Sequence, residues 1–363
     1  MAVPPTPLSL IDLPEETLRR NVEDVVRKHW VRPQPAESAP VLLEDGLEKT
    51  AHAVLDTLLT HQFRVGPLPP PELYQQFLEA VRCWVRRREP IRIFVGYGSH
   101  KNPNAVSYSR ADWADFFALC HLVAWHNKVQ RVYPPGLQLQ LFFDDEVVLL
   151  ANHADKRLID SYISSLSGLL RALQLESIFL PPSRLTHIAW FLRFGPYQLF
   201  RFILMQIAER RVRRWERDPA VAEQIERMTA FAKHNLVFAA HVSAAEQERL
   251  ARDASHRYRV CWEAFSLGKR IFARKDRLIA LYLDGSQHHR PQAALHLSSV
   301  AKGQVTQPWQ GEGVLLDNGH GRLVPFVLTA GRRPHYLMRI LKGLDLVPYP
   351  GFERLAIVQA RDG

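Results

Sequence analysis

Residues 90–104, Pro-Ile-Arg-Ile-Phe-Val-Gly-Tyr-Gly-Ser-His-Lys-Asn-Pro-Asn, decide the fold class of this chain. Their apolar run, 91–95, lies between a proline and a glycine and is typical of a short buried strand. A helical segment follows over 110–129, and the apolar run 137–143 then predicts a second strand, which ends at Asp144 and Asp145. This order of strand, helix and strand indicates an open α/β fold, in which ligands bind at the loops that follow the strands.

The rest of the chain divides into segments of different character. Residues 1–45 are rich in proline and predict an N-terminal arm with one helix near Glu15–His29. We expect residues 46–345 to form a single α/β domain, with a helical insertion at about 180–265 and a C-terminal tail at 346–363. The part after the insertion is β-rich, with short strands predicted over Leu278–Leu283, Ala293–Leu297, Gly313–Leu316 and Leu323–Val327.

The composition is that of an average globular protein, with 47% hydrophobic and 23% charged residues. No apolar run reaches the roughly 18 residues of a membrane span, so no membrane partner is expected. The start of the sequence lacks the basic and apolar regions of a signal peptide. Three cysteines, Cys83, Cys120 and Cys261, are far apart and in no metal-like spacing. These features predict a cytoplasmic protein with unpaired thiols.

The formal net charge of +10 is partly local, with arginine clusters at residues 86–88 and 210–217, the second of which falls on a probable helix. A solvated helix face explains such a cluster, and a binding surface for nucleic acid or for another anionic surface is the alternative. No zinc-finger spacing or RNA-binding aromatic pattern accompanies the cluster, so nucleic acid is not the expected partner.

The loop after the first predicted strand carries the best candidates for chemistry. Its glycines lack the third member of a dinucleotide-binding pattern, so no dinucleotide site is expected, and no P-loop or zinc-protease motif occurs. Lys101 can hold a phosphate or act as an amine, His100 can carry protons near neutral pH, and Asn104 can bond ligand hydroxyls. Asp144, after the second strand, can serve as a general base or orient an amine. An ordinary polar turn is the alternative at each position.

Further candidates come from other turns. Arg131, before the Tyr-Pro-Pro-Gly turn, can clamp an anion with two hydrogen bonds. Trp309 can wall a pocket, and Gln310 offers both a donor and an acceptor. A compact basic turn contains Arg332, Arg333 and His335, which can bind a phosphate, although a solvated loop explains them equally.

Taken in order, six segments resemble the isonitrile (isocyanide) synthases of the pyoverdine/dityrosine biosynthesis type, as a diverged member. The family loop Phe-Pro-x-Lys-Ser-Pro-Asn is similar to residues 99–104, and its Ile-Tyr-Pro-Pro-Gly and strand-end Ser-Asp-Gly are similar to 132–136 and 143–145. Tyr162 matches a family tyrosine. The C-terminal matches are Arg277 with the following strand, Thr306–Gly311 with Thr-Pro-Trp-His-Gly, and Gly331–Tyr336 with Gly-Arg-Pro-x-Tyr.

The resemblance implies a modified Rossmann-like fold, with a mixed sheet flanked by helices, and an enzyme of secondary metabolism. In that family an amino-acid amine condenses with C2 of ribulose 5-phosphate, and this carbon stays on nitrogen as the isonitrile, without a metal or redox cofactor. An iron/2-oxoglutarate oxygenase acting on the product is the implied partner. The implied roles are Lys101 at the ketone or phosphate, Asp144 as base or amine anchor, and Arg277, Arg332 and Arg333 as anion ligands.

The chain departs from the family pattern at several positions. The family histidine after the tryptophan is Gln310 here, a second family histidine is Leu281, and the glycine after the strand aspartate is Asp145. Two titratable groups are thereby missing. A related reaction, a different substrate, or a non-catalytic partner subunit are therefore open alternatives to the family reaction.

Overall fold

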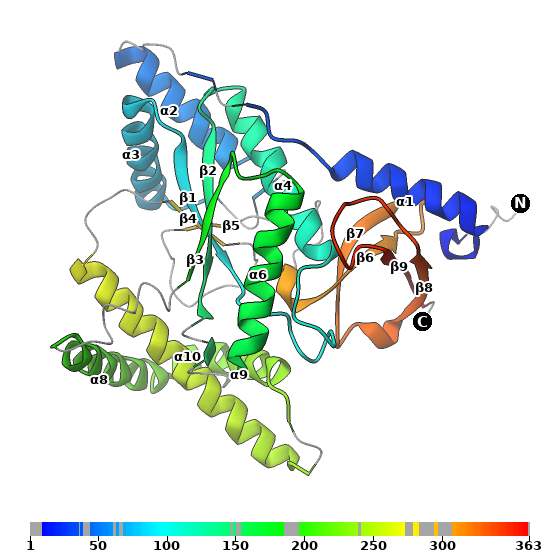
Figure 1. Cartoon of the computed structure of the whole chain (residues 1–363). Helices are drawn as coiled ribbons and strands as arrows, with labels where there is room; N and C mark the ends of the chain where they lie inside the picture. Colours follow the sequence, from blue (N-terminus) through cyan, green and yellow to red (C-terminus); the bar gives the residue numbers. More distant parts are fainter. Residues whose placement is uncertain are drawn as a thin grey trace, which may run out of the picture.

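The computed structural model describes residues 9–35, 37–38, 44–60, 63–64, 68–145, 148–149, 154–184, 196–238, 241–272, 279–282, 294–296 and 307–361. Its described strands form two sheets (Figure 1). The first sheet is parallel throughout, has the order β3-β2-β1-β4-β5 and confirms the predicted α/β class. Its strands are β1 (Ile91–Tyr97), β2 (Leu137–Phe143), β3 (Phe179–Arg184), β4 (Ile279–Tyr282) and β5 (Ala294–His296).

The second sheet is mixed, with the order β7-β6-β9-β8. Its members are β6 (Gly311–Asp317), β7 (Leu323–Thr329), β8 (Tyr336–Lys342) and β9 (Arg354–Ala360). The expectation of a C-terminal tail at 346–363 is therefore wrong, because β9 lies between β6 and β8. The apolar run 355–358 explains this position, since all four of its side chains are buried.

Helix α4 (Trp113–Gln130) joins the two sheets. It packs against β2 on one side and against β6 and β7 on the other (Figure 1). Fifteen of its 18 residues are buried, as expected for a helix that is apolar around its whole circumference. Asp112 caps its N-terminus and forms a capping box with Asp115.

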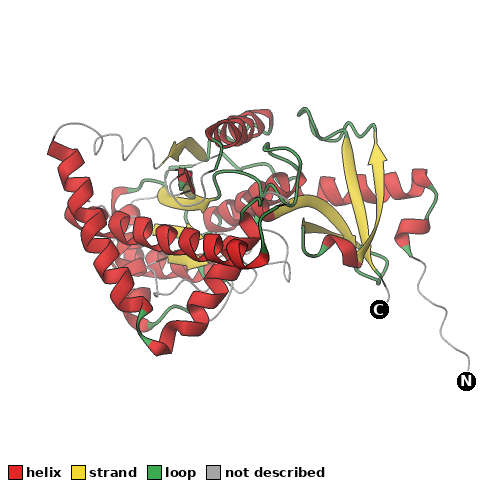
Figure 2. Cartoon of the chain, turned by 90° about the horizontal axis from the view of Figure 1, so that it is seen from below, coloured by secondary structure: helices red, strands yellow, loops and turns green. Residues whose placement is uncertain are grey.

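The remaining helices cover the sheets or form the insertion. Of these, α3 packs on β1, α6 on β3, and α1 on β7. The helical insertion is confirmed and gathers at the end of the molecule opposite the second sheet (Figure 2). The bounds are α1 (Glu15–His29), α2 (Glu44–Leu58), α3 (Pro71–Arg87), α6 (Lys156–Ala172), α8 (Pro196–Glu216), α9 (Ala222–Asn235) and α10 (Ala244–Phe272), with short 3-10 helices η1 (Leu10–Asp12), η3 (Pro219–Val221), η4 (Pro308–Gln310) and η5 (Arg333–His335).

The first described residues of the chain are tied to the second sheet. The backbone N–H of Leu10 donates to Asp317 Oδ2 at 2.8 Å, and the Ser9 hydroxyl bonds Gln359. Side chains of α1, Leu18, Val22 and Val26, join the same core as both sheets. The predicted arm thus contributes a helix to the core.

None of the described helices combines the length and the hydropathy that a membrane span requires.

Candidate functional site

Lys101 lies in the loop that follows β1, where the strand order changes direction. Strand β1 has β2 on one side and β4 on the other, and such a switch point opens a crevice at the carboxyl ends of the strands. The Lys101 side chain does not point into open space. Its Nζ is buried and donates to Asp112 Oδ1 at 2.7 Å, to Asp115 Oδ2 at 2.9 Å and to the Pro308 carbonyl at 2.9 Å.

The two carboxylates around Lys101 come from the first turn of α4 and are held on both sides. Asp115 Oδ1 accepts the hydroxyls of Tyr97 at 2.8 Å and Tyr162 at 2.6 Å. Asp112 Oδ1 also accepts the backbone N–H of Ala114 at 2.9 Å, which is its capping bond. We call Tyr97, Lys101, Asp112, Asp115 and Tyr162 the lysine–aspartate cluster. It ties the β1 loop to α4 and α6.

Electrostatics fix the charge state of this cluster. Burial lowers the pKa of Lys101, but the adjacent Asp112 and Asp115 outweigh burial and raise this pKa above its ordinary value. Burial raises the pKa of Asp112 to about 6, against the opposing effect of Lys101. The Lys101 ammonium thus stays protonated with all three N–H groups bonded. A role as a free amine is not supported by these surroundings.

Trp309 and Gln310, predicted from a segment 200 residues away, lie against the same loop. The Trp309 ring packs on Tyr97 with centroids 5.0 Å apart. A Cβ atom on Gly98 would lie 2.3 Å from Trp309 Cγ, so only glycine fits beneath the indole. The Trp309 carbonyl accepts the N–H of Asn102 at 2.8 Å, and the amide of Asn102 donates to Gln310 at 3.4 Å.

His100 and Asp144 flank the other side of the loop. Asp144 Oδ1 accepts the hydroxyl of the buried Ser99 at 2.7 Å, which confirms that the loops after β1 and β2 meet. The Nδ1 atom of His100 is buried and has no hydrogen-bond partner among the described residues. Burial lowers the pKa of His100 to about 4, so its imidazole is neutral near pH 7. A neutral imidazole can accept a proton from a ligand.

The neutral burial of His100 predicts a pH dependence of stability. The unfolded chain binds a proton at this histidine below about pH 6.5, whereas the folded chain binds it only near pH 4, so acid favours unfolding in this window. From pH 7 to pH 5 we expect the natural chain to lose about 1–2 kcal/mol more unfolding free energy than the His100→Asn variant loses. Urea titrations of both proteins at both pH values measure this change. An equal change in unfolding free energy with pH in the two proteins would contradict the prediction.

The predicted basic turn and Asn104 lie farther out. Arg333 pairs with Glu312 at 2.7 Å and also donates to the Ala105 carbonyl, so it touches the end of the Lys101 loop. Arg332 lies over the Phe326 ring, and its side chain is exposed, as is that of His335. Asn104 donates to the carbonyls of His234 and Leu236 in the insertion.

One predicted residue, Arg131, is not brought to this site. Arg131 caps the C-terminal end of α4 and precedes the start of β2, so it lies at the edge of the sheet opposite Lys101. Lys101 follows the carboxyl end of β1, whereas Arg131 precedes the amino end of β2, so α4 carries the chain from one end of the strands to the other. Spacing along the sequence did not show this separation. Arg277 lies outside the described residues.

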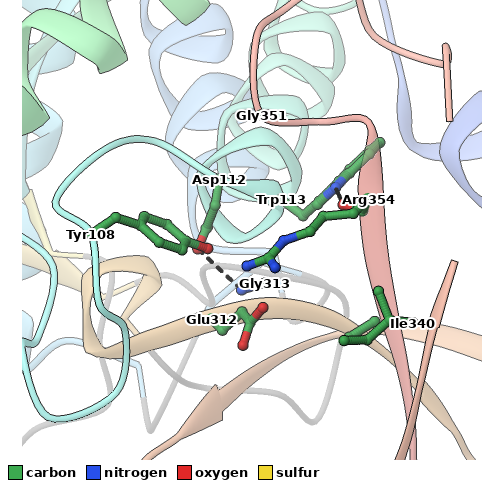
Figure 3. A pocket seen from close by; sticks show the side chains of 9 residues that line it. Tyr108, Asp112, Trp113, Glu312, Gly313, Ile340, Gly351 and Arg354 are labelled. Atoms are coloured by element: carbon green, nitrogen blue, oxygen red, sulfur yellow. Dashed lines mark hydrogen bonds between the residues drawn. The ribbon is translucent and has the colours of Figure 1, made fainter. Parts of the chain in front are cut away.

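A small pocket borders the lysine–aspartate cluster on the side of the second sheet. Tyr108, Asp112 and Arg354 point toward one another across it (Figure 3). Asp112 Oδ2 faces the pocket and is 3.4 Å from the N–H of Gly313. Burial, Asp112 and Glu312 raise the pKa of Tyr108 to about 12. The cavity volume of about 20 Å³ suffices for about one water molecule and excludes a sugar phosphate.

The carboxylates of the lysine–aspartate cluster were not predicted as site residues from the sequence. Asp112, Asp115 and Tyr97 were not among the predicted site residues. The available signal was the pairing of Asp112 and Asp115 within one helical turn, directly after a lysine loop. Among the described residues, no group of histidine, cysteine, aspartate or glutamate side chains has the arrangement of a metal site.

Comparisons with known proteins give a likeness in structure and no match by sequence. No protein-family model matches the chain, and no curated protein matches it by sequence. The crystal structure of the PvcA protein from Pseudomonas aeruginosa is similar, with a TM-score of 0.61 and 17% sequence identity. The match covers 86% of this chain and all of that chain. At this identity the likeness shows that the two chains share an overall fold.

Proposed function

We propose that this chain is an isonitrile-synthase-like enzyme that uses ribulose 5-phosphate as the carbon donor for an amino-acid amine. One observation carries the proposal. Segments that resemble the isonitrile synthases and lie far apart in the sequence, 99–104, Tyr162 and 309–310, meet around the end of β1. They do so in a fold shared with PvcA, a protein of the isonitrile synthase type.

The proposed chemistry needs proton transfers and a place for the phosphate. The amine attacks the C2 ketone and water leaves, after which enolisation, phosphate loss and cleavage of both the C1–C2 and the C2–C3 bonds leave this carbon on nitrogen and release C1 and the C3–C5 fragment. Asp144 and the neutral His100 are the proposed proton-transfer groups, because both belong to the loops at the carboxyl edge of the sheet. Arg332 and Arg333, with Arg277, are the proposed phosphate ligands.

Lys101 receives a positioning role in this proposal. Its ammonium is saturated by Asp112, Asp115 and a carbonyl, so it fixes the loop that presents His100. The product would pass to an iron/2-oxoglutarate oxygenase, the partner that the resemblance implies.

Activity with candidate substrates tests the proposal. The chain is incubated with ribulose 5-phosphate and each common amino acid in turn, while phosphate release and the infrared band of an isonitrile are followed. We expect one or a few amino acids to give both signals, and Asp144→Asn to lower the rate about 100-fold or more. Absence of both signals with every amino acid would refute the simple reaction.

Arg131→Ala is the matched control. Arg131 is an exposed cation at the opposite edge of the sheet, so its removal should leave the rate within about twofold. An equal loss of rate in Arg131→Ala and Asp144→Asn would contradict the location of the site.

A non-catalytic partner subunit is the second candidate, and one observation favours it. The lysine that the family motif places in the loop is fully paired, and the adjacent pocket holds about one water molecule. A purified chain that lacks activity alone but raises the activity of an oxygenase would support this candidate.

A further inference from the structure

Helix α8 turns an apolar and basic face toward solvent. Its inner face, Leu204, Ala208 and Val212, is buried against Val260 and Ala264 of α10. The side chains on the opposite face follow the helical repeat and are exposed. In its first half the exposed apolar residues are Leu199, Phe202, Ile203 and Ile207, with exposed fractions of 64%, 60%, 44% and 40%, and Gln206 is exposed beside them.

The second half of the same face carries arginines. Arg210, Arg214 and Arg217 follow the apolar residues at helical spacing on the side away from α10, and all three are exposed. None of the three forms an ion pair with a carboxylate of the described residues. By contrast, the neighbouring Arg211 and Arg213 are paired with Glu263 and Glu209. We call the seven residues Leu199, Phe202, Ile203, Ile207, Arg210, Arg214 and Arg217 the outer face of α8.

We propose that the outer face of α8 binds an anionic lipid bilayer surface. Helices that lie in a membrane interface bury leucine, isoleucine and phenylalanine side chains and keep arginines within reach of the head groups. On α8 the two kinds follow each other along one face, because the other face is buried against α10. The apolar residues would enter the boundary between head groups and acyl chains, while the arginines pair with anionic head groups. The net charge of +10 adds a long-range attraction to the same surface.

The combination of exposed apolar side chains and unpaired arginines favours an anionic bilayer over other binding partners. A nucleic acid offers phosphates but no apolar interior that would cover Phe202 and Ile203. A second copy of the chain would bring its own unpaired arginines against these, at a cost in repulsion. The sequence before the helix continues the same chemistry, since residues 188–194 read Ile-Ala-Trp-Phe-Leu-Arg-Phe.

This proposal is independent of the proposed function and revises the expectation of no membrane partner. That expectation rested on the absence of a span-length apolar run, and a helix lying on a bilayer needs no span. The outer face of α8 belongs to the insertion, whereas the lysine–aspartate cluster lies at the end of β1.

Co-sedimentation of the full chain with lipid vesicles tests the proposal. Vesicles of phosphatidylcholine alone are compared with vesicles that also contain phosphatidylserine, after nuclease treatment of the protein. We expect binding to the anionic vesicles only, weakening as salt increases. Replacing Arg210, Arg214 and Arg217 together by glutamine should lower the partition coefficient about 100-fold. Phe202→Ser with Ile203→Ser should lower it at least about tenfold.

A triple variant on other helices controls for net charge. Arg20→Gln, Arg27→Gln and Arg227→Gln remove three exposed arginines from α1 and α9. This variant should keep the partition coefficient within about threefold, and all variants should retain the natural circular dichroism spectrum. Equal loss in the two triple variants, binding independent of phosphatidylserine, or a dimer that Phe202→Ser dissociates without any vesicle binding would overturn the proposal.

Discussion

Lys101→Met is expected to lower the free energy of unfolding by about 3–5 kcal/mol at pH 7.5. Methionine matches the length of lysine but leaves the carboxylates of Asp112 and Asp115 buried without their counter-ion. A typical domain is stable by only about 5–15 kcal/mol, so this is a large fraction of the total. The loss should shrink at pH 5, because burial raises the pKa of Asp112 and its protonation removes the unpaired charge. Urea titrations at both pH values measure the effect.

Lys156→Met provides the control for removing a paired lysine. Lys156 also bonds an aspartate, Asp160, but its side chain is 69% exposed. Exposed pairs contribute about 1 kcal/mol at most, so this variant should unfold close to the natural midpoint. Similar losses in the two variants would show that burial of the Lys101 pair does not govern its effect.

Gly313→Ala is expected to cost about 3 kcal/mol of unfolding free energy. A Cβ atom at this position of β6 would lie 1.9 Å from the backbone nitrogen of Ala114 and 2.5 Å from the carbonyl carbon of Trp113. Both atoms belong to the first turn of α4, which cannot rotate away as a side chain can. The second sheet would have to move off α4, disturbing the cap at Asp112. Urea unfolding followed by tryptophan fluorescence measures the loss.

Gly331→Ala is the matched glycine variant. A Cβ atom there would meet only His234, at 3.8 Å, which is ordinary van der Waals contact. Its unfolding free energy should stay within about 0.5 kcal/mol of the natural value. If Gly313→Ala were as mild as Gly331→Ala, the close packing of β6 on α4 would be contradicted.

The fold could be predicted from the sequence where the apolar pattern of a segment matches the position of that segment in the folded protein. Strand β2 and the helix near Glu15–His29 were predicted with their observed bounds, because each apolar pattern ends at clear turn or cap residues. Strand β3 was missed, since its Pro181 and Pro182 argue against a strand. It lies at the edge of the first sheet, where a missing backbone N–H is tolerated.

The site could be predicted only in part, for a physical reason. Lys101, Tyr162, Trp309 and Gln310 were identified, and the structure brings them together. Their partners were not, because a buried ammonium is defined by what surrounds it in space, and spacing along the sequence does not contain that information. Asp112 shows the difficulty, since its capping bond and its ion pair use the same oxygen.

The place of β9 in the second sheet bears on how the protein is made. During synthesis the ribosome releases residues 354–360 after every other described strand, yet among these strands only β9 joins β6 and β8 into one hydrogen-bonded sheet. The parallel pairing of β1, β2 and β3 can form earlier, because those residues have already emerged. The hydrogen bond from Ser9 to Gln359 of β9 must wait as well, whereas the bond from Leu10 to Asp317 of β6 can form earlier. Such distant pairing slows folding and leaves apolar strand edges open to aggregation until β9 arrives.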